Sequence, residues 1–189
     1  MKYLTILILA ILIPQSPLFF AQNGKTEKFD DWFLPSKDGL NAIYVNIYLE
    51  DIGTFQTQTY YWTSSEAYAT NTYVQRFSDG LGGSTAKYNN IWVRPVRSFN
   101  STVIYSLGDK APAGGWIYNI TDLGSGNYKY YEVSFEDLET EPFSNIDDKL
   151  IGTTGTAIGT GAQNTLDIIG QTSHTSSAAK LCNDLIIYN

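Results

Sequence analysis

A chain of 189 residues, of which 43% are hydrophobic, is long enough for one domain with a genuine core. Its formal net charge of −7 argues against DNA, RNA and anionic lipid as partners, because polyanions are bound by basic surfaces. Cys182 is the single cysteine, so no internal disulfide can form and stability must come from packing.

The first residues have the pattern of a targeting segment. Lys2 precedes an apolar run from Leu4 to Ile13, and a small residue, Ala21, closes the segment. This pattern predicts a secretory signal peptide over residues 1–21, with an uncleaved anchor as the alternative. The run is shorter than the roughly 20 apolar residues of a membrane-spanning helix. We therefore expect a secreted or cell-surface protein that is not inserted in the membrane once the signal is removed.

The first half of the remaining chain begins with a helix and continues in strands. Ser36 can cap a helix that ends near Gly53. Strands rich in Tyr, Trp, Val and Thr are predicted at 59–65, 72–77 and 90–99. Pro95 predicts an edge or a bulge in the last strand. The apolar stripe of the helix is Leu40, Ile43, Tyr44, Ile47 and Tyr48.

The second half follows a polar, turn-rich seam at residues 100–114. In this half, strands are predicted at GWIYNI and YKYYEVSF, and an acidic segment, FEDLETEP, follows them. The stretch IGTTGTAIGTGAQNT lacks the Lys-Ser/Thr of a phosphate loop, so we predict a structured surface loop there. A final helix, capped by Ser176 or Ser177, follows. Its apolar stripe is Ala178, Leu181, Cys182, Leu185 and Ile186.

The candidate core draws on both halves of the chain. Cys182, on the apolar face of the final helix, is predicted to be a buried structural thiol rather than a nucleophile. The large side chains expected to be buried with it are Leu40, Ile43, Ile47, Leu181, Leu185, Trp62 and Trp116.

Several separate motifs resemble one family. The stretches DWFLPSKDGLNAIY, YYWTSSEAYATNTYVQRFSDG and IWVRPVRSF, together with GDKAPAGGWIYNI and SSAAKLCNDLI, resemble the Lcl C-terminal domain family of bacterial surface proteins. The fold of that family resembles C-type lectins and the formylglycine-generating enzymes. The resemblance covers most of residues 30–189. It implies an α+β, C-type-lectin-like fold, with two helices packed on a twisted, mostly antiparallel sheet.

The motifs stand in a different order from that of the family. In the family pattern the GGWIYNI-like strand comes first and the WVRPVR-like strand last, whereas here the half-unit at 30–99 precedes the half-unit at 108–189. We expect either one circularly permuted domain over residues 22–189 or a segment taken across a tandem junction. In such a fold the first and last strands pair, so the seam could join them, and Asn189 should lie close to Asp30. Exchange of half-units between chains is the rival arrangement.

Enzymatic chemistry has little support in the sequence, and we predict no catalytic residues, no cofactor and no metal site. His174, the single histidine, lies in a polar run, and no G-x-S-x-G motif accompanies it. The formylglycine-generating activity needs two cysteines, so it is not carried over. No sequence pattern for a calcium site is matched. We expect the acidic segment to form a solvated face, and a hydrolase site is the alternative. The acidic residues in and just before this segment are Glu132, Glu136, Asp137, Glu139 and Glu141.

Tyrosines and amides gather between the predicted strands at 59–65 and 90–99. Tyrosine gives a large contact area at low entropy cost, and asparagine gives adaptable hydrogen bonds, a mixture typical of recognition surfaces. Ordinary packing of half-exposed strands is the competing explanation. We expect a non-catalytic recognition or adhesion domain for a glycan or protein ligand, with a subunit that assembles by exchanged half-units as one alternative. The candidate ligand-binding residues are Tyr68, Asn71, Tyr73, Gln75, Tyr88, Asn89, Asn90 and Trp92.

Overall fold

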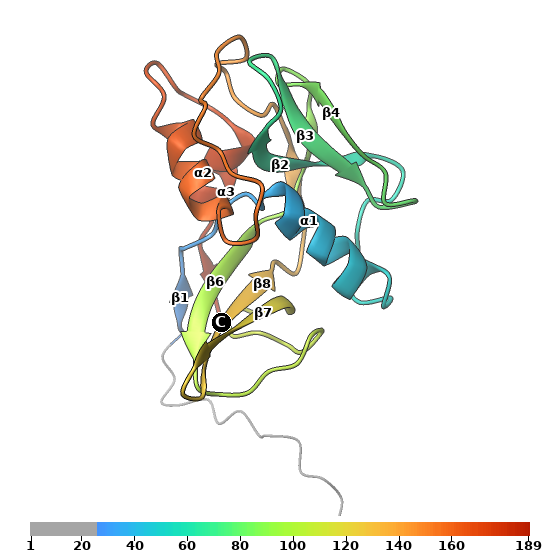
Figure 1. Ribbon diagram of the computed structural model, residues 1–189, viewed down its shortest axis with the longest axis vertical. Helices are drawn as coiled ribbons and strands as arrows, with labels where there is room; N and C mark the ends of the chain where they lie inside the picture. The colour runs from blue at the N-terminus through green and yellow to red at the C-terminus, as the bar shows by residue number, and fades with distance from the viewer. Residues whose placement is uncertain (1–25) are drawn as a thin grey trace, which may run out of the picture.

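A computed structural model describes residues 26–189, so the predicted signal peptide lies outside the described residues. The protein is α+β (Figure 1). Its helical elements are α1 (Lys37–Ile43), the π-helical η1 (Tyr44–Tyr48), α2 (Gly161–Ile169) and α3 (Ala178–Asn183). Its strands are β1 (Lys28–Phe29), β2 (Tyr60–Glu66), β3 (Asn71–Arg76), β4 (Gly82–Ala86), β5 (Ile91–Val93), β6 (Val96–Ser101), β7 (Trp116–Gly124), β8 (Asn127–Val133), β9 (Leu138–Glu141) and β10 (Ile187–Tyr188).

The strands form three sheets, and both halves of the chain contribute to each. The five-stranded sheet has the order β4-β3-β2-β5-β9, the three-stranded sheet β6-β8-β7, and β1 pairs with β10. Only the pairing of β2 with β5 is parallel among these ladders. The strand β9, from the second half, pairs with β5, and β6, from the first half, pairs with β8. The two half-units are therefore joined within one chain.

The α1 helix forms where the sequence predicts it. Ser36 has an extended backbone and its side chain accepts a hydrogen bond from the Gly39 N–H at 3.2 Å, as an N-cap does. Leu40, Ile43 and Ile47 are fully buried in a core shared with β7 and β8. The helix continues as η1, so its regular part ends well before Gly53.

Pro95 divides the predicted strand at 90–99 into β5 and β6, which belong to different sheets. A proline has no N–H to offer a ladder, so a break at this residue is physically expected. The Pro95 carbonyl instead accepts a hydrogen bond from the Ser134 N–H at 3.0 Å. The chain thus passes from the five-stranded to the three-stranded sheet at this point.

The seam does not join neighbouring strands. It connects β6 to β7, and β8 lies between these two in the sheet. The expectation that the two strands pair with each other is therefore wrong. The reason is the tight turn at Ser125–Gly126, which makes β7 and β8 a hairpin. The strand β6 therefore pairs with the other edge of β8.

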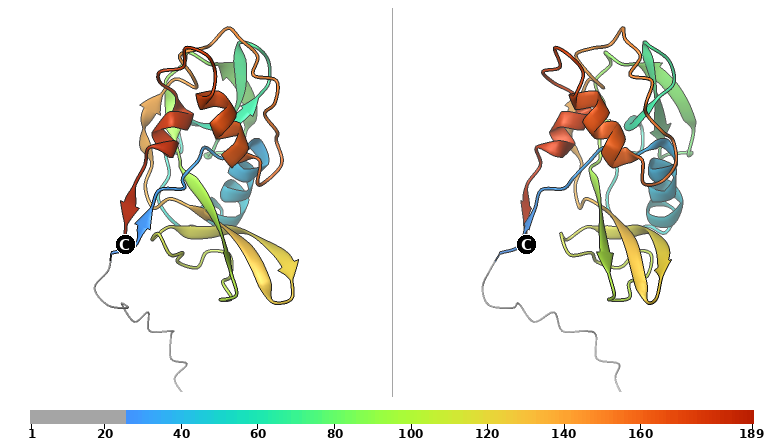
Figure 2. Two further views of the ribbon diagram at one scale, coloured as in Figure 1. Left: turned by 90° about the vertical axis from the view of Figure 1, so that its left-hand side faces the viewer. Right: turned by 60° about the vertical axis from the view of Figure 1, so that its left-hand side comes forward.

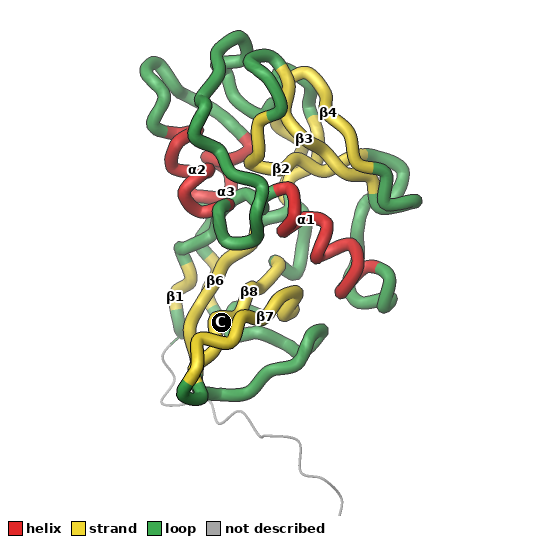
Figure 3. Tube along the Cα trace, in the orientation of Figure 1, coloured by secondary structure: helices red, strands yellow, loops and turns green. Residues whose placement is uncertain are grey.

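The Gly/Thr stretch is only partly a loop. Figure 3 shows a long loop before α2, but the sequence from Gly161 onward is helical, so the prediction of a surface loop through Thr165 is wrong. Asn164 and Thr165 are buried and hydrogen-bonded to β2 and to the Leu34 backbone, contacts that overcome the weak helix propensity of these residues. The described chain therefore has three α-helices rather than two.

The final helix is shorter than its apolar stripe predicts. Ser177 caps α3 by accepting from the Lys180 N–H, and Cys182 is fully buried, which raises the pKa of its thiol. Leu181 is only half-buried within the helix. Leu185 is half-buried and Ile186 is exposed, because the chain leaves the helix after Asn183. The expectation of complete burial is wrong for these leucines.

The two ends of the described chain lie side by side (Figure 2). The Glu27 N–H donates to the Asn189 carbonyl at 2.7 Å, and the Asn189 N–H donates to the Glu27 carbonyl at 3.0 Å. Phe29 and Ile187 are paired in the same ladder. Asp30 directly follows Phe29 in the chain, so the expected closeness of the Asn189 end to Asp30 is confirmed within one chain.

Candidate functional site

The predicted ligand-binding residues fall into separate groups. The first group lies at the tip of the β2–β3 hairpin, which is also the open end of the β3–β4 pair, where Asn71 pairs with Ala86. Tyr68 and Tyr88 are 68% and 67% exposed there, in the turns before β3 and after β4. Asn89 donates a side-chain hydrogen bond to Thr85 and is half-buried. Asn90, exposed in the same turn, completes this group, which we call the hairpin tip: Tyr68, Asn71, Tyr88, Asn89 and Asn90.

Trp92 lies apart from the first group. It is in the middle of β5, between Tyr61 of β2 and Thr140 of β9, where it is half-buried and packs against the core.

Tyr73 and Gln75, on β3, lie against the first turns of α1 rather than at the hairpin tip. The Lys37 ammonium lies 4.6 Å from the centre of the Tyr73 ring, a cation–π contact. Gln75, one of the predicted ligand-binding residues, is only 6% exposed, so most of its side chain is packed within the protein. Its side-chain NH2 donates to Asn41 Oδ1 at 3.0 Å and to the Gly80 carbonyl at 3.3 Å.

A hollow of about 300 Å³ lies beside these residues. We call it the α1–β3 hollow. No group among residues 26–189 donates a hydrogen bond to Gln75 Oε1, so this acceptor is open to solvent or to a ligand. Lys37 and Asp38 add one charge of each sign. The hollow is lined by Lys37, Asp38, Asn41, Thr63, Val74, Gln75, Gly80 and Gly82.

Local structure fixes the walls of the α1–β3 hollow. The Lys37 N–H donates to Ser65 Oγ at 3.0 Å, and the Asp38 N–H donates to the Thr156 carbonyl at 3.0 Å, so the start of α1 is held on both sides. Gly80 has φ +71°, and a Cβ there would lie 2.6 Å from the Tyr44 ring. Only glycine allows the β3–β4 turn to lie this close to the Tyr44 ring of η1.

Sequence reasoning missed the contribution of α1. The sequence predicts a helix after Ser36 but does not single out Lys37, Asp38 and Asn41, which form its polar side next to the buried stripe. Their spacing was the available signal, because residues at i and i+4 lie on one face of a helix. The sequence alone does not indicate that β3 packs beside that face.

The acidic segment is not uniformly solvated. Glu136 and Glu139 are exposed, but Glu132 is fully buried and pairs with Arg97 at 3.0 Å. Asp137 is largely buried and pairs with Arg94. The solvated-face prediction is therefore wrong for Glu132 and Asp137, because each of these carboxylates has an arginine from the first half of the chain as its partner.

Both buried carboxyl groups are part of the scaffold. Burial raises the pKa of Glu132, against the opposing hydrogen bonds from the Gly115 N–H and Arg97. Burial also raises the pKa of Asp137, which accepts from the Tyr61 hydroxyl at 2.8 Å. Arg94 Nε lies 3.0 Å from Asp137 Oδ1, but at an angle that does not make a hydrogen bond. Neither group lines the α1–β3 hollow.

His174 lies in the loop before α3. Its Nε2 is 2.9 Å from the hydroxyl oxygen of Ser177, the N-cap of that helix, and burial lowers the pKa of the imidazole. Within residues 26–189 no three His, Cys, Asp or Glu side chains gather as metal ligands would. In the same part of the chain, no helix has both the length and the apolar character to cross a bilayer.

No family model, no curated protein and no solved structure matches the chain.

Proposed function

We propose that the protein is a non-catalytic recognition or adhesion domain, exported to the cell surface or the medium, which binds a glycan or a protein ligand. The observation that carries the proposal is the α1–β3 hollow, where no group among residues 26–189 donates a hydrogen bond to Oε1 of the largely buried Gln75 side chain. A ligand group with a hydroxyl or N–H donor would satisfy that acceptor.

The chemistry of the hollow suits a sugar or a polar peptide side chain. Asn41 and Gln75 are amides, Asp38 is an acceptor and Lys37 a donor, so neighbouring hydroxyl groups could be bound in pairs. The Lys37 ammonium, which lines the hollow, also lies 4.6 Å from the centre of the Tyr73 ring. A volume of about 300 Å³ is at the small end of ligand sites, which suits one sugar ring or one side chain.

The hairpin tip would extend this contact. Its exposed tyrosines, Tyr68 and Tyr88, are large and lose little conformational entropy on binding. We expect the α1–β3 hollow to supply selectivity and the hairpin tip to supply further contact area with a larger ligand.

The specific type of α+β fold is part of the same proposal. We infer a C-type-lectin-like domain of the Lcl C-terminal type with its segments in permuted order. The hydrogen-bonded ends at Glu27 and Asn189 support the rearrangement, because the old and new termini of a permuted domain must each be closable. Because both half-units are already paired within one chain, a monomer is favoured over exchange of half-units, and light scattering should give a monomer mass.

Export has its own test. The mature protein should begin near Gln22 and lie outside the cytoplasm, according to the pattern of residues 1–21. Mass spectrometry of the purified protein reads the amino terminus directly. An intact Met1 form in the cytosol contradicts the export proposal.

The ligand is sought on a glycan and protein array, followed by affinity measurements on variants. For any hit, Tyr73→Ala and Asn41→Ala should weaken binding by about tenfold or more, since a few central residues dominate such sites. Tyr188→Ala, which removes a tyrosine 62% exposed on β10, is the matched control and should bind normally. If Tyr73→Ala and Asn41→Ala keep full affinity and a native melting curve, the hollow is not the ligand site.

A further inference from the structure

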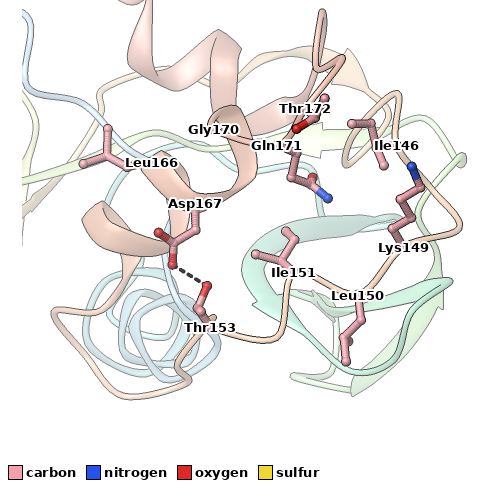
Figure 4. A pocket seen from close by; sticks show the side chains of 10 residues that line it. All are labelled: Ile146, Lys149, Leu150, Ile151, Thr153, Leu166, Asp167, Gly170, Gln171 and Thr172. Atoms are coloured by element: carbon pink, nitrogen blue, oxygen red, sulfur yellow. Dashed lines mark hydrogen bonds between the residues drawn. The ribbon is translucent and has the colours of Figure 1, made fainter.

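A second hollow, of about 500 Å³, shares no lining residue with the α1–β3 hollow. It lies between the loop that precedes α2 and the carboxyl end of α2 (Figure 4). We call it the α2 hollow. It is lined by Ile146, Lys149, Leu150, Ile151, Thr153, Leu166, Asp167, Gly170, Gln171 and Thr172.

One wall of the α2 hollow is held by a buried ion pair. The Glu66 carboxylate accepts hydrogen bonds from the Ile151 and Gly152 N–H groups, at 2.9 and 3.0 Å. The Lys87 ammonium lies 2.5 Å from Glu66 and donates to the Lys149 carbonyl at 2.8 Å. Because the side chains of Glu66 and Lys87 are almost completely buried, the loop has a fixed shape before any ligand arrives.

The Gln171 amide is the unsatisfied group in this hollow. Its Oε1 is buried, and no group among residues 26–189 hydrogen-bonds to it. A buried polar atom left without a partner costs free energy, and this holds whether the atom at that position is the oxygen or the nitrogen of the amide. A ligand with its own amide group would satisfy it.

Opposite charges flank the amide. In Figure 4 Asp167 and Lys149 lie on opposite sides of Gln171, with Ile151 near the middle. Asp167 accepts from Thr153 Oγ1 at 2.6 Å and from Gln163 Nε2 at 2.8 Å, which fix its position. Since a carboxylate has about four lone-pair sites, it can accept from a ligand as well.

We propose that the α2 hollow binds a short peptide with free ends. The peptide ammonium would lie at Asp167, a backbone amide at Gln171 and the carboxylate at Lys149, with small apolar side chains against Ile146 and Ile151. This order of charge, amide and opposite charge is that of a zwitterionic peptide of two to four residues, which extends by about 3.3–3.6 Å per residue.

The test is a titration of the ¹⁵N-labelled protein with trialanine, followed through the amide resonances of Gly152 and Gly170. We expect saturable shifts with a Kd of about 1 mM or tighter. Trialanine with an acetylated amino end and an amidated carboxyl end should bind at least about fivefold more weakly, because it has lost both charges.

Variants locate the binding site. Gln171→Met keeps the length of the side chain without its amide and should weaken trialanine binding at least about fivefold. Asp167→Asn should do the same. Gln58→Met, at an exposed glutamine that does not line the hollow, is the matched control and should bind normally.

Three outcomes overturn the proposal. One is the absence of saturable shifts with trialanine. The second is unchanged affinity in both Gln171→Met and Asp167→Asn, with native spectra. The third is saturable binding of N-acetylglucosamine but not of trialanine, which would assign the Gln171 amide to an acetamido sugar instead.

Discussion

At the scale of single residues, side chains with the same position in a sequence pattern differ in how deeply they are buried. Leu40 and Leu181 both lie on apolar helical stripes, yet Leu40 is fully buried and Leu181 is half-buried. The stripe is a reliable guide to which side of a helix faces the core. It says little about depth, because depth depends on what covers the helix from elsewhere in the chain.

Leu40→Ala should therefore cost more than Leu181→Ala. We expect about 2–5 kcal/mol for Leu40→Ala, which leaves a cavity in the core. Leu181→Ala should cost about 1 kcal/mol, since the side chain already contacts solvent. Denaturant unfolding measures both free energies, and equal losses would contradict the assigned depths.

His174 should make stability depend on pH. Burial lowers the pKa of its imidazole in the folded protein, so the unfolded chain takes up the proton first as the pH falls below the ordinary value of 6.5. Wild-type stability should thus fall with this acidification, relative to His174→Gln, which does not titrate. Thermal melts of both proteins between about pH 7 and pH 5 measure the difference. A constant difference across this range contradicts the shift.

At the scale of elements, the sequence predicts well what depends on neighbouring residues. Ser36 and Ser177 are the caps it predicts, and β2, β3, β7 and β8 are found where alternating Tyr, Val and Trp predict them. The strand β4 was missed, because Gly82 and Gly83 have low strand propensity and are held by pairing with β3. The helix α2 was missed for the same kind of reason, since long-range contacts of Asn164 and Thr165 support it.

The candidate site was predicted only in part for a related reason. Tyr73 and Gln75 were identified from composition, but the residues of α1 that complete the α1–β3 hollow come from a distant part of the sequence. Composition also grouped the hairpin tip with Trp92, because strand register cannot be read from one sequence. Composition does not tell whether a large aromatic side chain of a strand faces the core or the solvent.

Arg97 should be the most sensitive contact between elements. It joins Asp31, before α1, to Glu132 on β8. Arg97→Met leaves Glu132 buried without its partner and should cost about 3–5 kcal/mol near neutral pH. The cost should shrink as the pH falls, because a protonated Glu132 no longer needs a cation.

Asp31→Asn is the control for this prediction. Because the Asp31 side chain is 48% exposed, its loss should cost less than about 1 kcal/mol. Both free energies come from urea unfolding at two pH values. A loss in Arg97→Met no larger than that in Asp31→Asn contradicts the importance of the buried pair.

At the scale of the whole molecule, the order of the segments is less important than their contacts. Each half-unit supplies strands to sheets of the other, so neither is expected to fold alone. The same contacts could form in a chain that begins in the seam and ends with β6.

A permuted variant tests this expectation. Asn189 is joined to Glu27 by a hairpin loop of about four residues, and the chain is opened between Thr102 and Val103, where both residues are exposed. We expect a monomer with a native circular dichroism spectrum and a cooperative melt. An aggregated or unfolded product contradicts the proposed family order of the segments.

The pairing of β1 with β10 also decides how the protein responds to force. A pull applied to Glu27 and Asn189 acts on the same end of a two-residue antiparallel ladder, so its hydrogen bonds break one after another rather than together. Because the hydrogen bonds break one at a time, only a small force is needed to separate β1 from β10. The short ladder would open first and lengthen the molecule slightly, while the sheets that hold the α1–β3 hollow stay intact. A tethered domain with this geometry would absorb a small pull without losing its candidate ligand site.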